Sequence, residues 1–251
     1  MSARVAVVTG AGRGMGRATA LALATRGMRV LGVARTESEL ESLASEASIE
    51  FTVESVATEE GCVRIIHAAR RLGPVSVLVN NAGVGSFHER AIWEQEPEVW
   101  RETIAVNLDG PFYLTRLAAR DMIEARWGRI VMVSSTAGEV GAPATSAYCA
   151  SKHGLLGLMR AVAQDVAPFG VTCNAVCPGW VRTRMSECHT EVEAKERGLT
   201  VEEVWAERAA EYPAGRVVEP EEVANAIAFL ASEEASGING EAITVALGSL
   251  W

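Results

Sequence analysis

Residues 5–16 read VAVVTGAGRGMG, and this stretch decides the fold of the chain. A short apolar run leads into a glycine-rich turn, and an amphipathic stretch at 14–26 follows at once. Glycines let the backbone turn tightly and approach a phosphate, whose charge is then stabilised by the N-terminus of the next helix. The order strand, glycine turn, helix predicts the phosphate-binding first unit of an α/β sheet, and the alternative is an ordinary loop.

Six more apolar runs follow along the chain. All are short and rich in Val and Ile, which is typical of parallel strands covered by helices on both sides. The expected strands are 4–8, 29–33, 49–53, 75–79, 129–134, 171–176 and 242–245. The expected helices are 14–26, 60–72, 98–125, 147–167 and 221–231. This alternation predicts a Rossmann-like, doubly wound α/β fold, with helices on both faces of a parallel sheet, and residues 1–251 as a single domain.

Charge and cysteine content narrow the class of protein. The net charge of −9 disfavours nucleic acid and anionic membranes as partners. The first apolar run, from Val5, is too short for a signal peptide or a membrane span. The five cysteines form no C-x-x-C pair, so we expect reduced thiols and a cytoplasmic location.

We expect no metal site. Cys173 and Cys177 are near one another in sequence, but no His or Asp lies at ligand spacing around them, so buried thiols are the preferred interpretation. The histidines are scattered singly at 67, 88, 153 and 189, and we expect them to be solvated or packed.

Further motifs follow the expected strands and begin one helix. They are Asn80-Asn81-Ala82-Gly83, Asn107, Ser135, Tyr148-x-x-x-Lys152 and Pro178-Gly179. Together with the T-G-x-x-x-G-x-G spacing of residues 9–16, their order resembles the short-chain dehydrogenase/reductase family over essentially the whole chain. The resemblance implies an oxidoreductase that moves a hydride between a nicotinamide dinucleotide and a carbonyl or alcohol carbon.

The resemblance also implies the residues of the site. The catalytic residues would be Asn107, Ser135, Tyr148 and Lys152. The cofactor-binding residues would be Gly10, Gly12, Arg13, Gly14, Met15, Gly16, Arg35, Ser55, Val56, Asn81, Ala82, Gly83, Tyr148, Lys152, Pro178, Gly179, Val181 and Thr183. Ser55, preceded by Glu54, departs from the Asp that the family usually places against adenine.

Tyr148 and Lys152 lie four residues apart, on one face of an expected helix. A free phenol, with a pKa near ~10, is a poor base at neutral pH. A neighbouring ammonium favours the phenolate, so Tyr148 can exchange a proton with a substrate oxygen. Lysine occurs only at 152 and 195, which supports a role for Lys152. The alternative is a buried tyrosine beside a surface lysine.

Ser135 matches the family position that hydrogen-bonds the substrate oxygen. Its competitor is Ser134, and alternation along the strand points the two side chains in opposite directions. Asn107 resembles the asparagine that anchors a water between the lysine and solvent. The alternative for Asn107 is a side chain bonded to its own backbone.

The end of the second expected strand bears on the choice of cofactor. A free ribose 2′-hydroxyl is usually accepted there by Asp or Glu, and Ala34 is neither. Arg35, with Arg13 nearby, can instead pair with a 2′-phosphate. We therefore expect NADP(H) as the preferred cofactor. NAD(H) is the alternative, in which Arg35 is a solvated loop residue and Arg13 stacks on adenine.

The charged segment 183–216 follows the sixth expected strand, where α/β enzymes place substrate lids. Within it, Val201, Val204 and Trp205 have helical spacing, which predicts a short helix that lays an apolar face over the pocket. Closure of this lid over the pocket would exclude water from the site of hydride transfer. The alternative is a permanently packed surface helix.

In pattern the chain is similar to 3-oxoacyl and polyketide ketoreductases and to 3-hydroxybutyrate dehydrogenases. The dehydrogenases hold a carboxylate with Gln, His and Lys, where this chain has Gly85, Ala137 and Thr145. An acyl thioester or neutral ketone therefore fits better, because a buried carboxylate needs partners. The expected pocket lining is Val84, Gly85, Glu139, Val140, Trp180 and the lid.

The expected function is NADPH-dependent reduction of a ketone or 3-oxoacyl group to a secondary alcohol. The alternatives are NAD-dependent oxidation of a secondary alcohol or hydroxy acid, and a dinucleotide-binding sensor without turnover. The resemblance implies a homotetramer. The apolar arc of the helix after Lys152, formed by Leu155, Leu156, Met159, Val162 and Ala163, is broader than a helix covering a sheet needs, which supports the same expectation.

Overall fold

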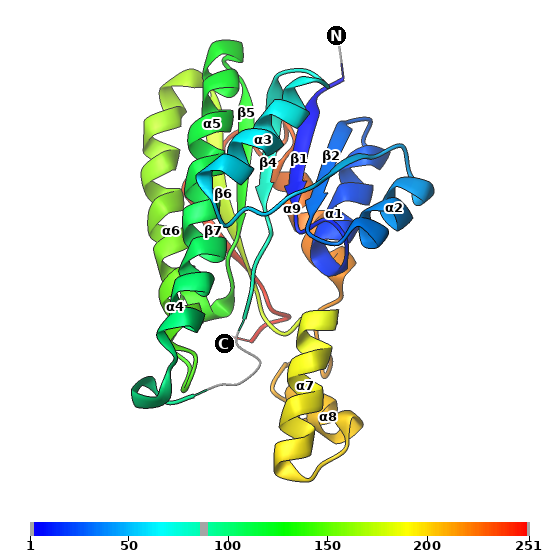
Figure 1. Cartoon of the computed structure of the whole chain (residues 1–251), viewed down its shortest axis with the longest axis vertical. Coiled ribbons are helices and arrows are strands. Elements are labelled where there is room, and N and C mark those ends of the chain that lie inside the picture. Colours follow the sequence, from blue (N-terminus) through cyan, green and yellow to red (C-terminus); the bar gives the residue numbers. More distant parts are fainter. Residues whose placement is uncertain (1–2, 86–89, 250–251) are drawn as a thin grey trace.

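The computed structural model of the chain describes residues 3–85 and 90–249, so His88 lies outside the described residues. Within them, seven strands form a parallel sheet in the order β3-β2-β1-β4-β5-β6-β7 (Figure 1). The strands are β1 (Val5–Thr9), β2 (Arg29–Ala34), β3 (Glu50–Val53), β4 (Val75–Asn80), β5 (Gly128–Val133), β6 (Val171–Pro178) and β7 (Ala242–Val245). This confirms the predicted doubly wound parallel sheet.

The helices alternate with the strands up to β6. They are α1 (Gly14–Thr25), α2 (Glu37–Glu46), α3 (Glu59–Arg70), α4 (Pro97–Ile104), α5 (Gly110–Ala125), α6 (Ser146–Val166), α7 (Arg184–Arg197), α8 (Val201–Ala210) and α9 (Pro220–Leu230). In the described part of the chain, no helix is long and apolar enough to cross a membrane.

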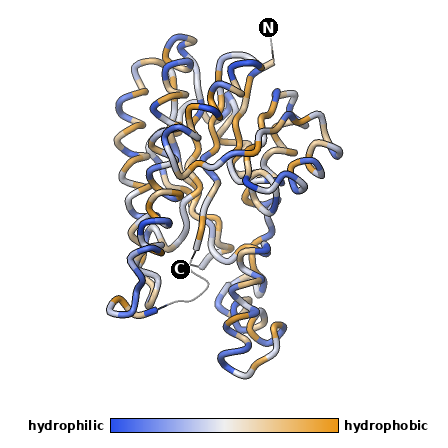
Figure 2. The backbone as a smooth tube through the Cα atoms, viewed as in Figure 1, coloured by the Kyte–Doolittle hydropathy of each residue, from blue (hydrophilic) through white to orange (hydrophobic). Residues whose placement is uncertain are grey.

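Two hydrophobic cores lie on opposite faces of the sheet. One core joins buried residues of α3, α5 and α6, and the other joins those of α1, α2 and α9. Hydrophobic residues are concentrated along the central strands (Figure 2). Because the central strands contribute side chains to both cores, their sequences are apolar on both faces.

The strand order reverses between β1 and β4, and this reversal determines where a ligand can bind. β1 pairs with β2 through Val8 and Gly32 on one side, and with β4 through Val8 and Val79 on the other. The helices after β1 and β4 lie on opposite faces of the sheet, which leaves a crevice at the carboxyl ends of these strands. The glycine turn that follows β1 lies at this crevice.

Two local predictions were wrong in detail. The expected helix 98–125 is interrupted at Ala105–Asp109 by a π-helical turn, a wider turn that often occurs at functional sites. The helix α2 was not predicted. Among its ten residues only Leu40 and Leu43 are buried, so its sequence carries a weak apolar pattern.

The apolar arc of α6 is used within the chain itself. Leu155, Leu156, Met159 and Ala163 are all buried in the core that α6 shares with α3 and α5. The interpretation that this arc extends beyond what the sheet needs was therefore wrong. Any support for an oligomer has to come from other surfaces.

The segment 183–216 forms two helices, of which only α8 was predicted. The pair α7 and α8 projects from the body of the molecule, and the two helices pack chiefly on each other (Figure 1). Trp205 of α8 packs with Tyr212 and Val217 in a small separate core. The apolar face of α8 therefore stabilises the helix pair, and the prediction that this face covers the pocket was wrong.

Candidate active site

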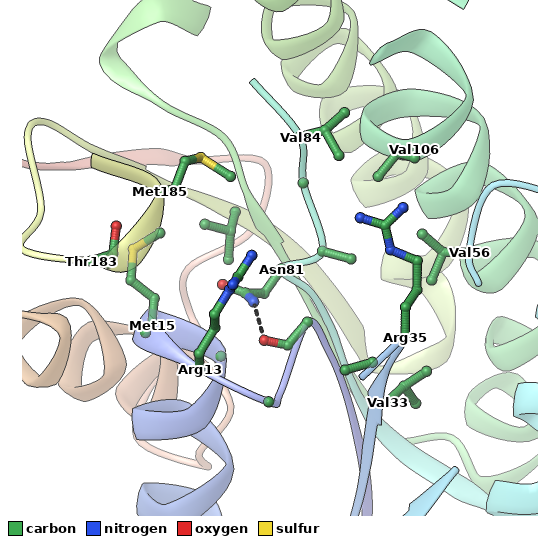
Figure 3. Close-up of a pocket in the computed structure, with 18 of the residues that line it drawn as sticks. Arg13, Met15, Val33, Arg35, Val56, Asn81, Val84, Val106, Thr183 and Met185 are labelled. Atoms are coloured by element: carbon green, nitrogen blue, oxygen red, sulfur yellow. Dashed lines mark hydrogen bonds between the residues drawn. The ribbon is translucent and has the colours of Figure 1, made fainter. Parts of the chain in front are cut away.

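A cavity lies at the carboxyl ends of β1, β2 and β4, and it brings together most of the residues predicted to bind the cofactor. The predicted residues that line it are Gly10, Gly12, Arg13, Gly14, Met15, Gly16, Arg35, Ser55, Val56, Asn81, Ala82, Gly83, Tyr148, Lys152 and Thr183. Segments that are far apart in the sequence thus meet at one crevice (Figure 3).

Three of the residues predicted to bind the cofactor do not line this cavity, and neither do the predicted catalytic residues Asn107 and Ser135. Gly179 packs against the ring of Tyr212, whose hydroxyl is 2.5 Å from the backbone nitrogen of Trp180. Val181 is buried and forms a bridge with Val218. Pro178 ends β6 inside the sheet. Strand-like pairing with Val218 and Val245 holds this segment in place.

The glycine turn fits a phosphate-containing ligand. Gly10 and Gly14 have φ angles of +66° and +54°, which side chains other than glycine rarely adopt. A Cβ on Gly16 would stand 2.1 Å from the carbonyl oxygen of Gly10. Gly16 therefore lets the first turn of α1 pack tightly on the glycine turn, and the N-terminus of α1 lies at the cavity, where a ligand phosphate would be stabilised.

Thr9 and Asn81 tie the ends of β1 and β4 together. The Thr9 hydroxyl accepts from the backbone N–H groups of Asn81 and Ala82, at 3.0 and 2.9 Å. The Asn81 side-chain amide donates to the carbonyl oxygens of Thr9 and Gly10, the latter bond drawn in Figure 3. The role of Thr9 was not predicted, because its buried hydroxyl acts on a segment distant in sequence.

Tyr148 and Lys152 lie on the first turns of α6, at the cavity. The Ser135 side chain lies near the Tyr148 hydroxyl and lowers the pKa of the phenol. The Lys152 ammonium lies 5.5 Å from the centre of the Tyr148 ring and donates to the carbonyl of Val133 at 2.9 Å. Lys152 is only 4% exposed, which excludes the alternative of a surface lysine.

Burial controls the titration of both groups. Desolvation raises the pKa of Tyr148, and the hydrogen bond from Ser135 acts in the opposite direction. Desolvation lowers the pKa of Lys152 to about 8. Burial therefore moves the lysine pKa toward neutrality and the phenol pKa away from it, because in both cases it disfavours the charged form.

Ser134 and Ser135 point in different directions, as predicted from strand alternation. The Ser134 hydroxyl donates to the backbone carbonyl of Lys152 at 3.1 Å and so holds the first turns of α6. The Ser135 hydroxyl accepts from the N–H of Ala137 at 3.1 Å and also meets Tyr148. Ser135 is therefore the serine placed beside the phenol.

Asn107 lies in the π-helical turn and is fully buried. Its amide exchanges two hydrogen bonds of 2.9 Å with the backbone of Val84, and it donates to the Ser151 hydroxyl at 3.1 Å. The Asn107 side chain is therefore bonded to other segments, and the alternative that it bonds to its own backbone is wrong. Asn107 fixes the segment after β4 to α6, beside Gly83 and Lys152.

A scan of family models matches the short chain dehydrogenase model over residues 4–194. The chain is 36% identical to the 3-oxoacyl-acyl-carrier-protein reductase FabG of Escherichia coli (strain K12), covering 96% of this chain and 95% of FabG. It is 35% identical to the D-beta-hydroxybutyrate dehydrogenase of Cupriavidus necator, with 96% and 95% covered. Among solved structures it resembles a single-substitution variant of actinorhodin polyketide ketoreductase with NADPH, with TM-score 0.93 and 35% identity over 98% of this chain and 97% of that one.

This chain belongs to the short-chain dehydrogenase family. It is accordingly an oxidoreductase of the type that interconverts alcohol and carbonyl groups. The family resemblance inferred from the sequence motifs is confirmed.

The cationic end of this short-chain dehydrogenase holds an unpredicted acid. Arg13 and Arg35 reach into the cavity from the glycine turn and from the end of β2 (Figure 3). Glu39, on the first turn of α2, also lines the cavity and pairs with Arg13 at 3.4 Å. It was missed because α2 itself was missed; a helix there would have placed residue 39 near the strand end.

The tyrosine end of the cavity is apolar, but its lining differs from the prediction. Val84, Val106 and Met185 line it, and a Cβ on Gly85 would stand about 4 Å from the side chains of both Tyr148 and Met185. Glu139 instead accepts from Thr244 at 3.0 Å. The wall contributed by 183–216 is Thr183, Arg184 and Met185 at the start of α7.

Trp180 belongs to the core of the helix pair instead of the cavity wall. The guanidinium of the buried Arg208 lies 3.7 Å from its ring centre, and the ring of His189 lies 5.4 Å away. Arg208 also pairs with Glu193 at 2.6 Å and bonds to the Thr190 hydroxyl. These contacts join α7 and α8 into one packed unit.

The described residues contain no group of three or more His, Cys, Asp or Glu side chains placed to hold a metal. His153 bonds to the Cys149 carbonyl at 2.9 Å, and His189 packs as described above. Cys173 and Cys177 are buried, and desolvation raises the pKa of Cys177 to about 12.

Proposed function

We propose that this protein reduces a ketone or 3-oxoacyl group to a secondary alcohol with NADPH, and that Tyr148 donates the proton. One observation carries the proposal: a partly buried phenol, neighboured by Ser135 and by the buried Lys152 ammonium, lies in a cavity that begins at the glycine turn. The names of the relatives, a 3-oxoacyl reductase and a polyketide ketoreductase, support the same substrate class.

Each residue of the site has a separate role in the proposed reduction. The bound nicotinamide would supply the hydride for the carbonyl carbon. Tyr148 gives its proton to the carbonyl oxygen, which becomes the alcohol hydroxyl. Ser135 orients that oxygen toward the phenol, and the Lys152 ammonium stabilises the phenolate left behind. Asn107 positions α6 through Ser151 and the segment after β4 through Val84.

NADP(H) is the proposed cofactor. Arg13 and Arg35 both line the cavity, and Ala34 offers no acceptor at the end of β2. A guanidinium can bind a 2′-phosphate with two parallel hydrogen bonds. These residues support NADP(H), with NAD(H) as the second cofactor.

Oxidation of a small hydroxy acid is the alternative, because one relative is a hydroxybutyrate dehydrogenase. Gly85, Ala137 and Thr145 provide no charge for a carboxylate, and the Thr145 hydroxyl is bonded to the Ala142 carbonyl at 2.9 Å. This favours a neutral ketone or a thioester. A sensor without turnover would not need the contact between Tyr148 and Ser135.

The test is a panel of ketones, 3-oxoacyl thioesters and 3-hydroxy acids, followed by NADPH or NADH absorbance. The Tyr148→Phe variant should lose about 10²–10⁴-fold in kcat while it binds NADPH within a few-fold of the native protein. Activity of Tyr148→Phe close to the native level would contradict the role of the phenol. Turnover confined to hydroxy acids and NAD⁺ would establish the alternative.

We also propose a homotetramer in the cytoplasm. The free cysteines fit a reducing compartment. Exposed Trp100 on α4 and Phe112 on α5, each more than two-fifths exposed, offer apolar surface for a partner subunit.

A further inference from the structure

Glu39 places a carboxylate at the cationic end of the dinucleotide cavity. It lines the cavity together with Gly12, Arg13 and Ala34. A Cβ on Gly12 would stand 2.6 Å from Oε2 of Glu39 and 3.5 Å from the Cβ of Ala34. The carboxylate therefore occupies the space between the glycine turn and the end of β2.

The position of this carboxylate is set by the helix that carries it. Leu40 and Leu43 anchor α2 in the core and are fully buried. The backbone carbonyl of Glu39 accepts from Arg17 at 3.5 Å, and Oε1 pairs with Arg13 at 3.4 Å. The Glu39 side chain is 31% exposed, so a ligand in the cavity can reach it.

We propose that Glu39 narrows the preference of this chain for NADP(H) over NAD(H) by accepting the 2′-hydroxyl of an adenosine ribose and opposing a 2′-phosphate. This inference rests on the proposed use of a nicotinamide dinucleotide. In this chain the ribose acceptor comes from the first turn of α2, because the end of β2 carries Ala34.

The two ribose substituents meet different chemistry at Glu39. An ionised carboxylate only accepts hydrogen bonds, so it can bind a hydroxyl but repels a phosphate. A 2′-phosphate must also draw Arg13 away from Glu39, whereas a 2′-hydroxyl leaves that ion pair intact. Arg35, which forms no ion pair among the described residues, favours the phosphate. Arg35 thus favours NADP(H) and Glu39 favours NAD(H). We therefore expect the protein to bind both cofactors, with a smaller preference for NADP(H) than Arg35 alone would give.

The experiment measures binding, so it does not depend on a known substrate. Dissociation constants for NADPH and NADH, and for the fragments 2′,5′-ADP and 5′-AMP, are determined by calorimetry for the native protein and for Glu39→Gln. Glu37→Gln is the matched control, since Glu37 lies in the same turn of α2 but is exposed and does not line the cavity. Glu39→Ala serves as a second variant, and thermal unfolding verifies that each variant is folded.

Removal of the Glu39 charge should raise the ratio of the NADPH affinity to the NADH affinity by about tenfold or more. The ratio of the 2′,5′-ADP affinity to the 5′-AMP affinity should rise as well. Glu37→Gln should leave both ratios within about twofold. Ratios that stay unchanged in both Glu39 variants, or that shift equally in Glu37→Gln, would overturn the inference. If the native protein binds neither dinucleotide, the proposed function itself is wrong. Failure of the proposed function can therefore be distinguished from failure of the inference about Glu39.

Discussion

At the scale of single residues, the phenol of Tyr148 depends on Ser135 for its acidity. Burial raises the phenol pKa, and the Ser135 hydrogen bond is the contact that lowers it. Loss of that bond should raise the Tyr148 pKa further, since the phenolate loses a donor. In the oxidation direction Tyr148 must be deprotonated, so the rate falls as pH drops through this pKa.

Ser135→Ala should therefore move the acidic limb of the pH profile for alcohol oxidation to higher pH by roughly one to two pH units. The measurement is kcat/KM for oxidation against pH. Ser134→Ala is the control: its hydroxyl is bonded to the Lys152 carbonyl, so it should cost about 1 kcal/mol of stability and leave the limb in place. A limb that moves equally in both variants would contradict the role of Ser135.

The buried lysine predicts a pH dependence of stability. The pKa of Lys152 is about 8 in the folded chain, against 10.5 for an ordinary lysine. Between these values the unfolded state binds more protons than the folded state, so stability rises with pH. Below about pH 8 the folded protein carries the cost of a buried ammonium.

Lys152→Met should lack this dependence. Relative to the variant, the native protein should gain roughly 3 kcal/mol of unfolding free energy between pH 8 and 10.5. Denaturant titrations of both proteins across this range give the difference directly. A difference that stays constant, or that falls with pH, would show that Lys152 is not held at a lowered pKa.

At the scale of elements, α7 and α8 form a unit that is packed within itself and sparsely joined to the sheet. Arg208 and Trp180 supply its interior, and Tyr212 links it to the segment after β6. The cavity wall from this unit comes from the first turn of α7. We therefore expect a substrate lid that moves as a pair, with α7 as the surface that meets ligand.

Hydrogen exchange can test this lid. With NADPH and a substrate analogue bound, amides at 184–197 should exchange at least several-fold more slowly, because the start of α7 contacts ligand. The amides of α3, which does not line the cavity, serve as the internal control. Equal protection of residues 183–216 in the free and bound states would contradict the lid and show that the helix pair is permanently packed.

At the scale of the whole molecule, oligomerisation is expected on the face formed by α4 and α5. Phe112 is 45% exposed there and contacts the ring of Tyr113. Phe112→Glu places a charge on this face, which should weaken a subunit contact by several kcal/mol. Light scattering should then show a smaller particle than the native protein.

Val53→Glu is the control, because Val53 is similarly exposed but lies on the edge strand β3, away from α5. This variant should keep the native particle mass. A native protein that scatters as a single chain at micromolar concentration would refute the expected tetramer.

The sequence by itself determined the strands, the glycine turn and the spacing of Tyr148 and Lys152. All three are local patterns, since buried parallel strands require continuous apolar runs and four residues make about one helical turn. The family motifs also indicated Ser135 as the serine that binds the substrate oxygen, and this role remains a prediction. Weak patterns failed: α2 has only two buried anchors, and the π-helical turn interrupts a run that otherwise has helical periodicity.

Only the tertiary structure decided which segments meet. The apolar residues of α6 and α8 were recognised, but their periodicity does not say whether a sheet, a neighbouring helix or a partner will cover them. The packing of Trp180 against Arg208, and the approach of Glu39 to Gly12, are contacts between elements that sequence spacing does not encode. The spacing of Tyr148 and Lys152 could therefore be predicted from a local motif, whereas the charge at the opposite end of the cavity depends on how α2 packs against the glycine turn.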